Sequence, residues 1–348
     1  MKLIKDKPIV DINIEGYKHV TWMVNNFCPF KCWYCPSPTW DGPREATYSW
    51  EVCAQFIDIL VDRYPKNSYL NITGGEPTSW PYLEKFIDKF YYNSWQIILI
   101  TNLSNFEILQ KQANKLKNVV ASYHPNVINT ETKRKKWVEK VHRLADHVDV
   151  NIRLMMDPRH WDHCLDFYNQ MPSSNLKIQP ARLWSWPWDG EQDENILNPN
   201  VQDAKIGYTL EQEEILNTFG YGLKIGKDVD PGDPHIKCMV KYDDGDSDVF
   251  EGAEDFWGVP AELTIKEKNQ FKGWKCDIGL NNVVVDAYGG VSKSMCELAR
   301  QKYIGTLIEP DNIQWADKPV TCPYNLCFCD YEVLIPKTKG IDNVHNIY

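Results

Sequence analysis

Six short apolar segments alternate with five amphipathic segments between residues 19 and 183, and this alternation constrains the fold more than any other feature. The amphipathic segments carry apolar residues at helical spacing, and the apolar segments have the length of strands. Strands separated by single helices predict parallel βαβ units, hence an α/β sheet or an open barrel. The six predicted strands are 19–24, 68–73, 96–101, 119–124, 148–156 and 176–183.

Two motif-like segments follow predicted strands directly. Residues 28–35 follow the first strand, and residues 74–76 follow the second. In parallel α/β folds the chemistry lies beyond the carboxyl ends of the strands. We therefore expect both segments at the functional end of the sheet.

The chain contains eleven cysteines among 348 residues. It has no apolar run of about 18 residues and no apolar signal-peptide core, which predicts a cytoplasmic protein without a membrane partner. A reducing compartment disfavours disulfides, so these cysteines indicate metal binding, catalysis or core packing. The net charge of −10 disfavours nucleic acid as a partner.

Three of the cysteines, Cys28, Cys32 and Cys35, have the spacing Cys-x3-Cys-x2-Cys. A structural zinc site needs four ligands, and no fourth cysteine or histidine lies nearby. On a cubane iron–sulfur cluster, three thiolates leave one iron without a protein ligand, which suits a site that binds a substrate. The motif therefore favours an open 4Fe-4S cluster.

At these residues the chain resembles the radical S-adenosylmethionine (radical SAM) superfamily, whose signature has this spacing with an aromatic residue before the last cysteine, here Tyr34. The resemblance covers about residues 19–183 and implies a partial (β/α)6 TIM-like barrel. It implies a 4Fe-4S cluster whose open iron chelates S-adenosylmethionine (SAM). It also implies reductive cleavage of SAM to a 5′-deoxyadenosyl radical, with electrons from a reductase such as flavodoxin or ferredoxin.

The resemblance extends to a glycine motif. Gly74, Gly75 and Glu76 are similar to the Gly-Gly-Glu motif of the superfamily. A glycine pair lets the backbone approach a ligand closely, and a carboxylate suits a bound ammonium group. The resemblance therefore implies that these residues bind SAM.

Polar residues near the ends of later strands continue the resemblance. Thr101 and Asn102 resemble the polar end of the third strand in the superfamily, and Ser122 and Arg153 stand where relatives place SAM contacts. Ser122 could equally be a hydrogen-bonded strand serine, and Arg153 a surface ion-pair partner. The expected adenine contact is the backbone of Tyr34, because the Gly-x-Ile-x-Gly-x-x-Glu motif of some relatives is not found.

A second cysteine group lies in the last quarter of the chain, where a hairpin is predicted between its first two members. This group resembles the SPASM and twitch extensions of radical SAM enzymes, which implies one auxiliary 4Fe-4S cluster. The expected ligands are Cys276, Cys296 and Cys322, together with either Cys327 or Cys329, and a structural zinc site is the alternative. The five are Cys276, Cys296, Cys322, Cys327 and Cys329.

The other three cysteines have different predictions. Cys53 and Cys164 each lie on the apolar face of a predicted helix, so we expect them in the core. Cys238 lies in a segment rich in Asp, Gly and Pro (226–256), interpreted as a loop-rich connector, and its role stays open between packing and a ligand or substrate contact.

These observations divide the chain into five parts. We expect a lead-in (1–18), a radical SAM partial barrel (19–183), a loop-rich connector or substrate region (184–270), a SPASM/twitch-like auxiliary cluster module (271–335) and a tail (336–348). The predicted fold is thus an α/β partial barrel with a small C-terminal cluster-binding extension.

The resemblance implies a radical SAM enzyme of oxidoreductase or maturase type. It would abstract a hydrogen atom from a small molecule, a nucleotide derivative or a short peptide, and its auxiliary cluster would aid oxidation or bind substrate. The competing hypothesis is a non-catalytic iron–sulfur or zinc protein that carries electrons or acts as a binding module. The motif at 74–76 favours the enzyme, because an electron carrier needs no site that chelates an amino acid.

Overall fold

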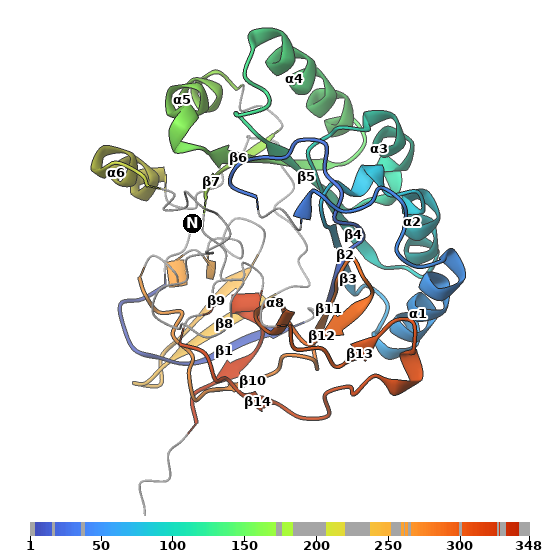
Figure 1. Ribbon diagram of the computed structural model, residues 1–348. Helices are drawn as coiled ribbons and strands as arrows, with labels where there is room; N and C mark the ends of the chain where they lie inside the picture. Colours follow the sequence, from blue (N-terminus) through green and yellow to red (C-terminus); the bar gives the residue numbers. More distant parts are fainter. Residues whose placement is uncertain are drawn as a thin grey trace, which may run out of the picture.

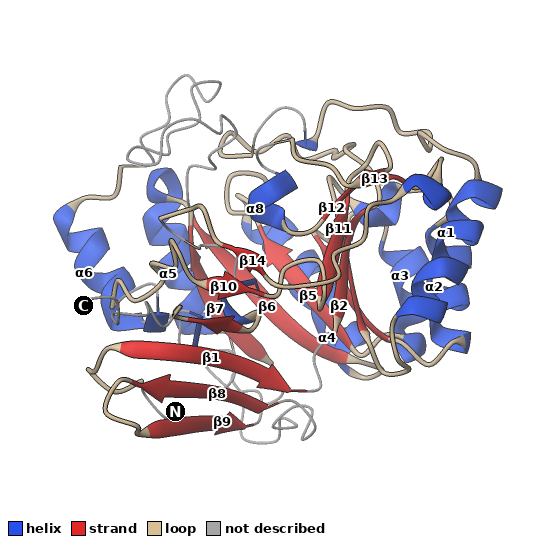
Figure 2. Ribbon diagram, turned by 90° about the horizontal axis from the view of Figure 1, so that it is seen from below, coloured by secondary structure: helices blue, strands red, loops and turns tan. Residues whose placement is uncertain are grey.

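The computed structural model describes residues 4–15, 18–35, 39–171, 176–183, 207–219, 237–251, 259–260, 262–263, 266–298, 301–325, 327 and 332–340. These residues form one sheet of nine strands and one of six (Figures 1 and 2). No helix within them is both long enough and apolar enough to span a membrane.

The predicted barrel is confirmed. Six parallel strands are neighbours in the order of the sequence, and Figure 1 shows the helices between them as an arc along the outer side of the sheet. The strands are β2 (His19–Met23), β3 (Tyr69–Thr73), β4 (Gln96–Thr101), β5 (Asn118–Tyr123), β6 (Asp149–Met156) and β7 (Lys177–Arg182). The helices are α1 (Trp50–Arg63), α2 (Leu83–Tyr92), α3 (Phe106–Gln112), α4 (Glu131–Ala145) and α5 (Trp161–Gln170).

Local sequence signals explain where these helices begin and end. At the start of α1, the Ser49 side chain accepts a hydrogen bond from the Val52 amide, and Pro65 follows the end of the helix. A reciprocal pair of bonds joins Thr209 and Gln212 at the start of α6 (Leu210–Phe219), as the capping-box pattern predicts. These bonds satisfy helix amides that would otherwise lack partners.

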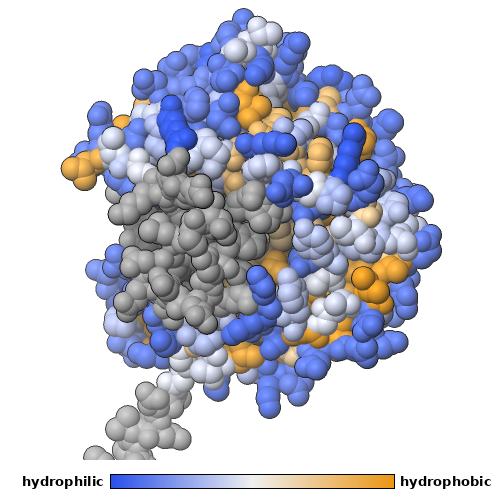
Figure 3. Space-filling view, viewed as in Figure 1, coloured by the Kyte–Doolittle hydropathy of each residue, from blue (hydrophilic) through white to orange (hydrophobic). Residues whose placement is uncertain are grey.

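The main core lies between the barrel sheet and its helices. Trp22 of β2 is fully buried and meets the rings of Phe56, Phe86 and Phe90 edge-on. Cys53 and Cys164 belong to the same core, which confirms their predicted packing role. Because the helices bury their apolar faces here, the face shown in Figure 3 is mainly hydrophilic, with hydrophobic colour confined to separate patches.

A second sheet closes the inside of the barrel, and the sequence analysis did not predict it. Its strand order is β14-β10-β15-β1-β8-β9, and Figure 2 shows β1, β8 and β9 as a layer beside the barrel strands. Its apolar residues pack against Tyr69, Ile98 and Val120, which lie near the starts of their strands. The opposite, carboxyl ends of the strands are therefore left for the functional site.

The interpretation of residues 226–256 as a loop-rich connector is wrong for its described part. Residues 237–251 form the antiparallel strands β8 (Lys237–Tyr242) and β9 (Ser247–Glu251). β8 also pairs with β1 (Ile9–Glu15), which lies in the segment predicted as a lead-in. Alternate residues of β8 are buried, which anchors the strand despite the charged residues around it. Cys238 is one of these buried residues and packs in the core of this sheet.

The C-terminal segment contributes to both sheets. The predicted hairpin is present as β11 (Asn282–Val285) and β12 (Gly290–Ser292), and β11 pairs in parallel with β2. With β13 (Gly305–Thr306) these strands extend the barrel sheet to nine. The remaining pieces are the helix α8 (Met295–Leu298) and the two-residue strands β10 (Lys275–Cys276), β14 (Val320–Thr321) and β15 (Lys337–Thr338).

Candidate functional site

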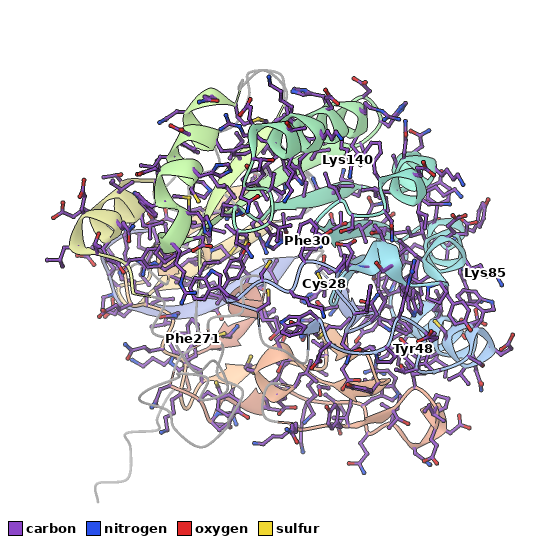
Figure 4. The ribbon with its side chains drawn as sticks, turned by 45° about the horizontal axis from the view of Figure 1, so that its top comes forward. Cys28, Phe30, Tyr48, Lys85, Lys140 and Phe271 are labelled. Atoms are coloured by element: carbon purple, nitrogen blue, oxygen red, sulfur yellow. The ribbon has the colours of Figure 1, made fainter. Side chains whose placement is uncertain are left out.

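A cavity of about 140 Å³ lies at the carboxyl ends of β2 to β5. Figure 4 shows Cys28 and Phe30 near the centre of the molecule, inside the arc of helices. The predicted site residues that line the cavity are Cys28, Cys32, Cys35, Gly74, Gly75, Glu76, Thr101, Asn102 and Ser122. Two separate motifs and two strand ends therefore meet at one place, as the rule for parallel sheets leads us to expect.

Gly74 and Gly75 allow the cysteine loop to lie directly against the end of β3. The Gly75 amide donates to the Asn25 carbonyl at 2.8 Å, and the Glu76 amide donates to the Phe27 carbonyl at 2.7 Å. A Cβ atom on Gly74, where φ is +136°, would lie 2.3 Å from the Asn25 carbonyl oxygen, and one on Gly75 would lie 2.4 Å from that of Phe27. Both positions require glycine for close backbone packing.

The Glu76 side chain holds the ends of β3 and β4 together. Its Oε1 accepts from the Thr78 amide at 3.0 Å, from the Thr78 hydroxyl at 2.5 Å and from the Thr101 hydroxyl at 2.6 Å. Its Oε2 accepts from the Asn102 amide at 2.8 Å. The carboxylate is only 1% exposed, so four donors from the protein itself supply the hydrogen bonds that a buried anion needs.

The three sulfur atoms of the cysteine loop have different surroundings. The hydrogen bond between Cys32 and Cys35, together with the nearby His124, lowers the pKa of Cys32, and the same hydrogen bond raises the pKa of Cys35. Burial raises the pKa of Cys28 to about 11, and Asn102 Nδ2 donates to its sulfur at 3.4 Å. Thiolates are the form that binds metal, so a bound cluster would favour the ionised form of all three cysteines.

His124, at the end of β5, is a site residue that the sequence analysis missed. Its Nδ1 lies 3.4 Å from the Cys32 sulfur and 2.7 Å from the Tyr34 hydroxyl oxygen, and its ring stacks on that of Tyr34. His124 also lines the cavity. Its position as the last residue of the predicted strand 119–124 was the available signal, because Thr101 was noticed at the end of the predicted strand 96–101.

A second missed group anchors the cysteine loop from the side of β6. Trp33 donates from Nε1 to Asp157 Oδ2 at 3.0 Å, and the Arg159 guanidinium lies 3.8 Å from the centre of the Trp33 ring. Asp157 is fully buried and also contacts His160 Nδ1 at 3.0 Å. These contacts fix Trp33, which lies between Cys32 and Tyr34. The cysteine loop is therefore held by the end of β3 on one side and by the segment after β6 on the other.

Arg153 lies next to the cavity without lining it. It is the direct neighbour of Ser122 across the pairing of β5 with β6, and Ser122 itself lines the cavity. Tyr34 is buried, and its hydroxyl contacts His124 and Asn126. The SAM-binding roles of Arg153 and Tyr34 stay predictions.

The donor set of the cavity fits an open iron–sulfur cluster. Within the described residues, no three histidine, cysteine or acidic side chains are placed to hold a single metal ion. An iron–sulfur cube carries its cysteines on different irons, so three sulfurs spaced around one cavity suit a cluster better than one ion. A chelated ligand would meet the polar residues at the adjoining strand ends.

The second cysteine group comes together from four separate segments. Burial raises the pKa of Cys327 to about 12, and the charges of Cys276 and Cys322 act in the same direction. Burial also raises the pKa of Cys296, with further contributions from Glu332, Cys327 and Cys276. The four thiols are therefore close enough for their charges to act on one another, while Cys329 lies outside the described residues.

Part of the chain matches a known protein family. Residues 22–169, from β2 to the end of α5, match the family model described as the radical SAM superfamily. A search among curated proteins finds no match.

Several solved structures are similar to this chain at low identity. "Native anSMEcpe with bound AdoMet" is 13% identical, with 84% of this chain and 78% of that chain covered and a TM-score of 0.49. SuiB of Streptococcus suis bound to S-adenosylmethionine is 14% identical, with 86% and 65% covered and a TM-score of 0.49. BtrN in complex with AdoMet and 2-DOIA is 11% identical, with 86% and 83% covered and a TM-score of 0.38.

Proposed function

We propose that this chain, which carries a radical SAM superfamily domain over residues 22–169, is an enzyme that cleaves SAM reductively and abstracts a hydrogen atom from a substrate. The observation that carries the proposal is the cavity itself. Three cysteines with the superfamily spacing, the Gly-Gly-Glu segment and the polar ends of two further strands all line it. An electron carrier would need the cysteines but not the other two features.

The residues around the cavity have separate roles in this proposal. Cys28, Cys32 and Cys35 would hold a 4Fe-4S cluster with one open iron, and residues 74–76 with Thr101, Asn102 and Ser122 would contact SAM. When bound, cluster and SAM supply the electron and the 5′-deoxyadenosyl radical. The hydrogen bonds of Glu76 and Asp157 would keep the strand ends and the cysteine loop in one geometry.

The second sheet would exclude water from the barrel interior. Its apolar residues pack against the inward-facing residues at the starts of the barrel strands, opposite the cavity. A radical reacts with any nearby C–H bond, so a closed and rigid site limits the reaction to the substrate held there.

The proposal includes an auxiliary 4Fe-4S cluster on the second cysteine group. Cys276, Cys296, Cys322 and Cys327 are close enough for their charges to act on one another, which supports four thiolate ligands. Cys329 is a fifth candidate. The cluster would take an electron from the substrate radical or bind the substrate directly. A structural zinc site is the competing hypothesis for this group.

The proposed substrate belongs to one of three classes. A small molecule, a nucleotide derivative or a short peptide would fit, with a flavodoxin or ferredoxin as the electron donor and the cytoplasm as the compartment. The net charge of −10 argues against a long nucleic acid as substrate.

Production of 5′-deoxyadenosine tests the proposed reaction. The full-length protein, purified without oxygen and reduced with dithionite, should convert SAM to 5′-deoxyadenosine. Cys32→Ala should abolish this product, whereas Cys164→Ala, the same substitution at a core cysteine, should retain it. A Cys32→Ala protein that still cleaves SAM would contradict the proposed cluster site.

Metal counting tests the auxiliary cluster separately. Two clusters correspond to about eight irons with matching sulfide per chain and no zinc. About four irons and one zinc would reject the auxiliary cluster and leave the SAM-cleaving site intact.

A further inference from the structure

A buried lysine lies within the second cysteine group. Lys337 of β15 is 2% exposed, and its Nζ donates to the carbonyl oxygens of Glu332 at 2.7 Å, Val333 at 3.1 Å and Ile335 at 2.8 Å. Three acceptors at hydrogen-bond distance require the three donors of an ammonium group, which a neutral amine does not have. The chain thus holds a positive charge at a fixed point away from water.

The strand register places this charge beside Cys276. Lys337 is directly opposite Cys276 in the pairing of β15 with β10, and directly opposite Ile12 in the pairing with β1. Directly opposite residues project from the same face, with Cβ atoms about 4.5–5.5 Å apart. The ring centre of Phe271, which is labelled in Figure 4, lies 5.3 Å from Lys337 Nζ.

The electrostatics of the cysteines agree with this placement. Burial raises the pKa of Cys276, and the positive charge of Lys337 acts against that rise. Burial likewise raises the pKa of Cys327, again opposed by Lys337. The lysine therefore acts on two thiols that come from separate segments of the chain.

Lys337 donates no hydrogen bond to a carboxylate among the described residues, since each of its hydrogen bonds ends on a neutral carbonyl oxygen. Its positive charge does act on the carboxyl groups of Glu332 and Asp277, whose pKa values it lowers against the effect of burial. The nearby Glu332 carboxylate instead accepts from Asn282 Nδ2 at 3.1 Å and from the Met295 amide at 2.7 Å. A buried ammonium group that makes no hydrogen bond to a carboxylate can still balance further negative charge, such as thiolates beside it.

We propose that Lys337 is the fixed counter-charge of the auxiliary iron–sulfur cluster and raises its reduction potential. The inference rests on the proposed auxiliary cluster. Reduction adds one electron, hence one negative charge, to a cluster held by thiolates. A nearby positive charge in a poorly solvated region therefore stabilises the reduced cluster more than the oxidised cluster. Lys337 would thereby suit the cluster to accept a single electron.

Three variants of the full-length enzyme separate charge from shape. Lys337→Gln removes the charge and keeps an amide group that can donate to the carbonyls, while Lys337→Arg keeps the charge. Lys275→Gln is the matched control, because Lys275 precedes Cys276 on the same strand but is exposed and donates to Thr321 Oγ1. Water and salt screen a charge on that side of the sheet.

The measurement is a redox titration of the anaerobic holoenzyme followed by electron paramagnetic resonance, with and without SAM. The signal of the auxiliary cluster is the one that SAM does not alter. For Lys337→Gln we expect the ratio of reduced to oxidised cluster at a given potential to fall at least about tenfold, which is about 59 mV for one electron. Lys337→Arg and Lys275→Gln should stay close to the wild type.

Each outcome decides the inference. An intact auxiliary cluster with an unchanged potential in Lys337→Gln would overturn it. If Lys337→Gln loses the four auxiliary irons, the inference stands when Lys337→Arg retains them, and fails when Lys337→Arg loses them too. The iron count of the wild-type enzyme is made first, so absence of the second cluster would be recognised as a failure of the proposed function rather than of the lysine's role.

Discussion

The Nδ1 atom of His124 lies 3.4 Å from the sulfur of Cys32, so a residue at the end of β5 touches a loop that follows β2. The same nitrogen lies 2.7 Å from the Tyr34 hydroxyl oxygen. One imidazole therefore contacts two residues of the cysteine motif. Hydrogen bonds to the sulfurs are one of the features that set the potential of an iron–sulfur cluster.

His124→Phe should lower the reduction potential of the SAM-binding cluster and slow formation of 5′-deoxyadenosine. The substitution keeps an aromatic ring beside Tyr34 but removes the nitrogen, and a hydrogen bond to a charged group is worth about 1.5–3 kcal/mol. We expect a rate loss of about tenfold or more under limiting reductant. The checks are a redox titration and a product assay.

His163→Phe is the control for that substitution. His163 also contacts a tyrosine, with Nε2 2.6 Å from the Tyr123 hydroxyl oxygen and the two rings stacked, but it lies on α5 away from the cavity. Equal effects of the two substitutions would mean that the contact with Cys32 has no special part in the reaction.

Glu76→Gln should destabilise the protein and weaken SAM binding together. An amide nitrogen would face at least one of the donors that now bond to the carboxylate, and a buried donor left without an acceptor costs about 1–3 kcal/mol. Urea unfolding and equilibrium dialysis with SAM measure the two effects. Glu84→Gln, on the exposed side of α2, should change neither, and a similar loss there would refute the role of Glu76.

Asp157→Asn should make the cysteine loop lose its cluster more rapidly. Asp157 Oδ2 accepts from Trp33 Nε1 and Oδ1 accepts from the Arg159 amide, and an asparagine cannot supply acceptors at both of its side-chain atoms. Iron release to a chelator over time is the measurement. Asp162→Asn, a change of the same kind at an exposed position of α5, should release iron at the wild-type rate.

His19 should make folding stability depend on pH. Burial lowers its pKa from 6.5 to about 3, so below pH 6.5 the unfolded chain takes up a proton that the folded chain does not. The contribution of His19 to the free energy of unfolding therefore falls as the pH falls, by about 1 kcal/mol between pH 7 and pH 5.5. Urea unfolding at both values measures the change.

The wild type must be compared with His19→Asn at each pH, because another group acts in the opposite direction. Burial raises the pKa of Glu332 to about 7, so its contribution to stability grows as the pH falls toward 4.5. Glu332 contributes equally to the wild type and to His19→Asn, so its contribution cancels in the difference between their free energies of unfolding. His142→Asn, on the exposed face of α4, is the control. If the difference in free energy of unfolding between wild type and His19→Asn is the same at both pH values, the role assigned to His19 is contradicted.

Features encoded in short stretches of the chain were predictable. The alternation of apolar strands and amphipathic helices determined the six barrel strands, and Ser49 and Thr209 marked helix starts through bonds to amides three residues later. The spacing of the three cysteines at 28–35 is likewise local. The position of His124 at a strand end follows the same rule and could have been included.

Features that depend on contacts between distant segments were not predictable. The pairing of β11 with β2 joins residues more than 250 positions apart, and the second sheet combines β1 with strands from the last third of the chain. Strands of two residues, such as β10 and β15, have no periodicity to detect. Their partners are selected by the burial of the whole sheet.

The amino-acid sequence by itself therefore determined the barrel and the chemistry of its cysteine motif, because hydrophobic periodicity and ligand spacing act over a few residues. Only the tertiary structure decided which distant groups share a site. It placed Glu76 in bonds to Thr101 and Asn102, His124 beside Cys32, and Lys337 opposite Cys276. The physical reason is that the energy of a buried charge or thiol is set by neighbours in space, which strand register and packing bring together.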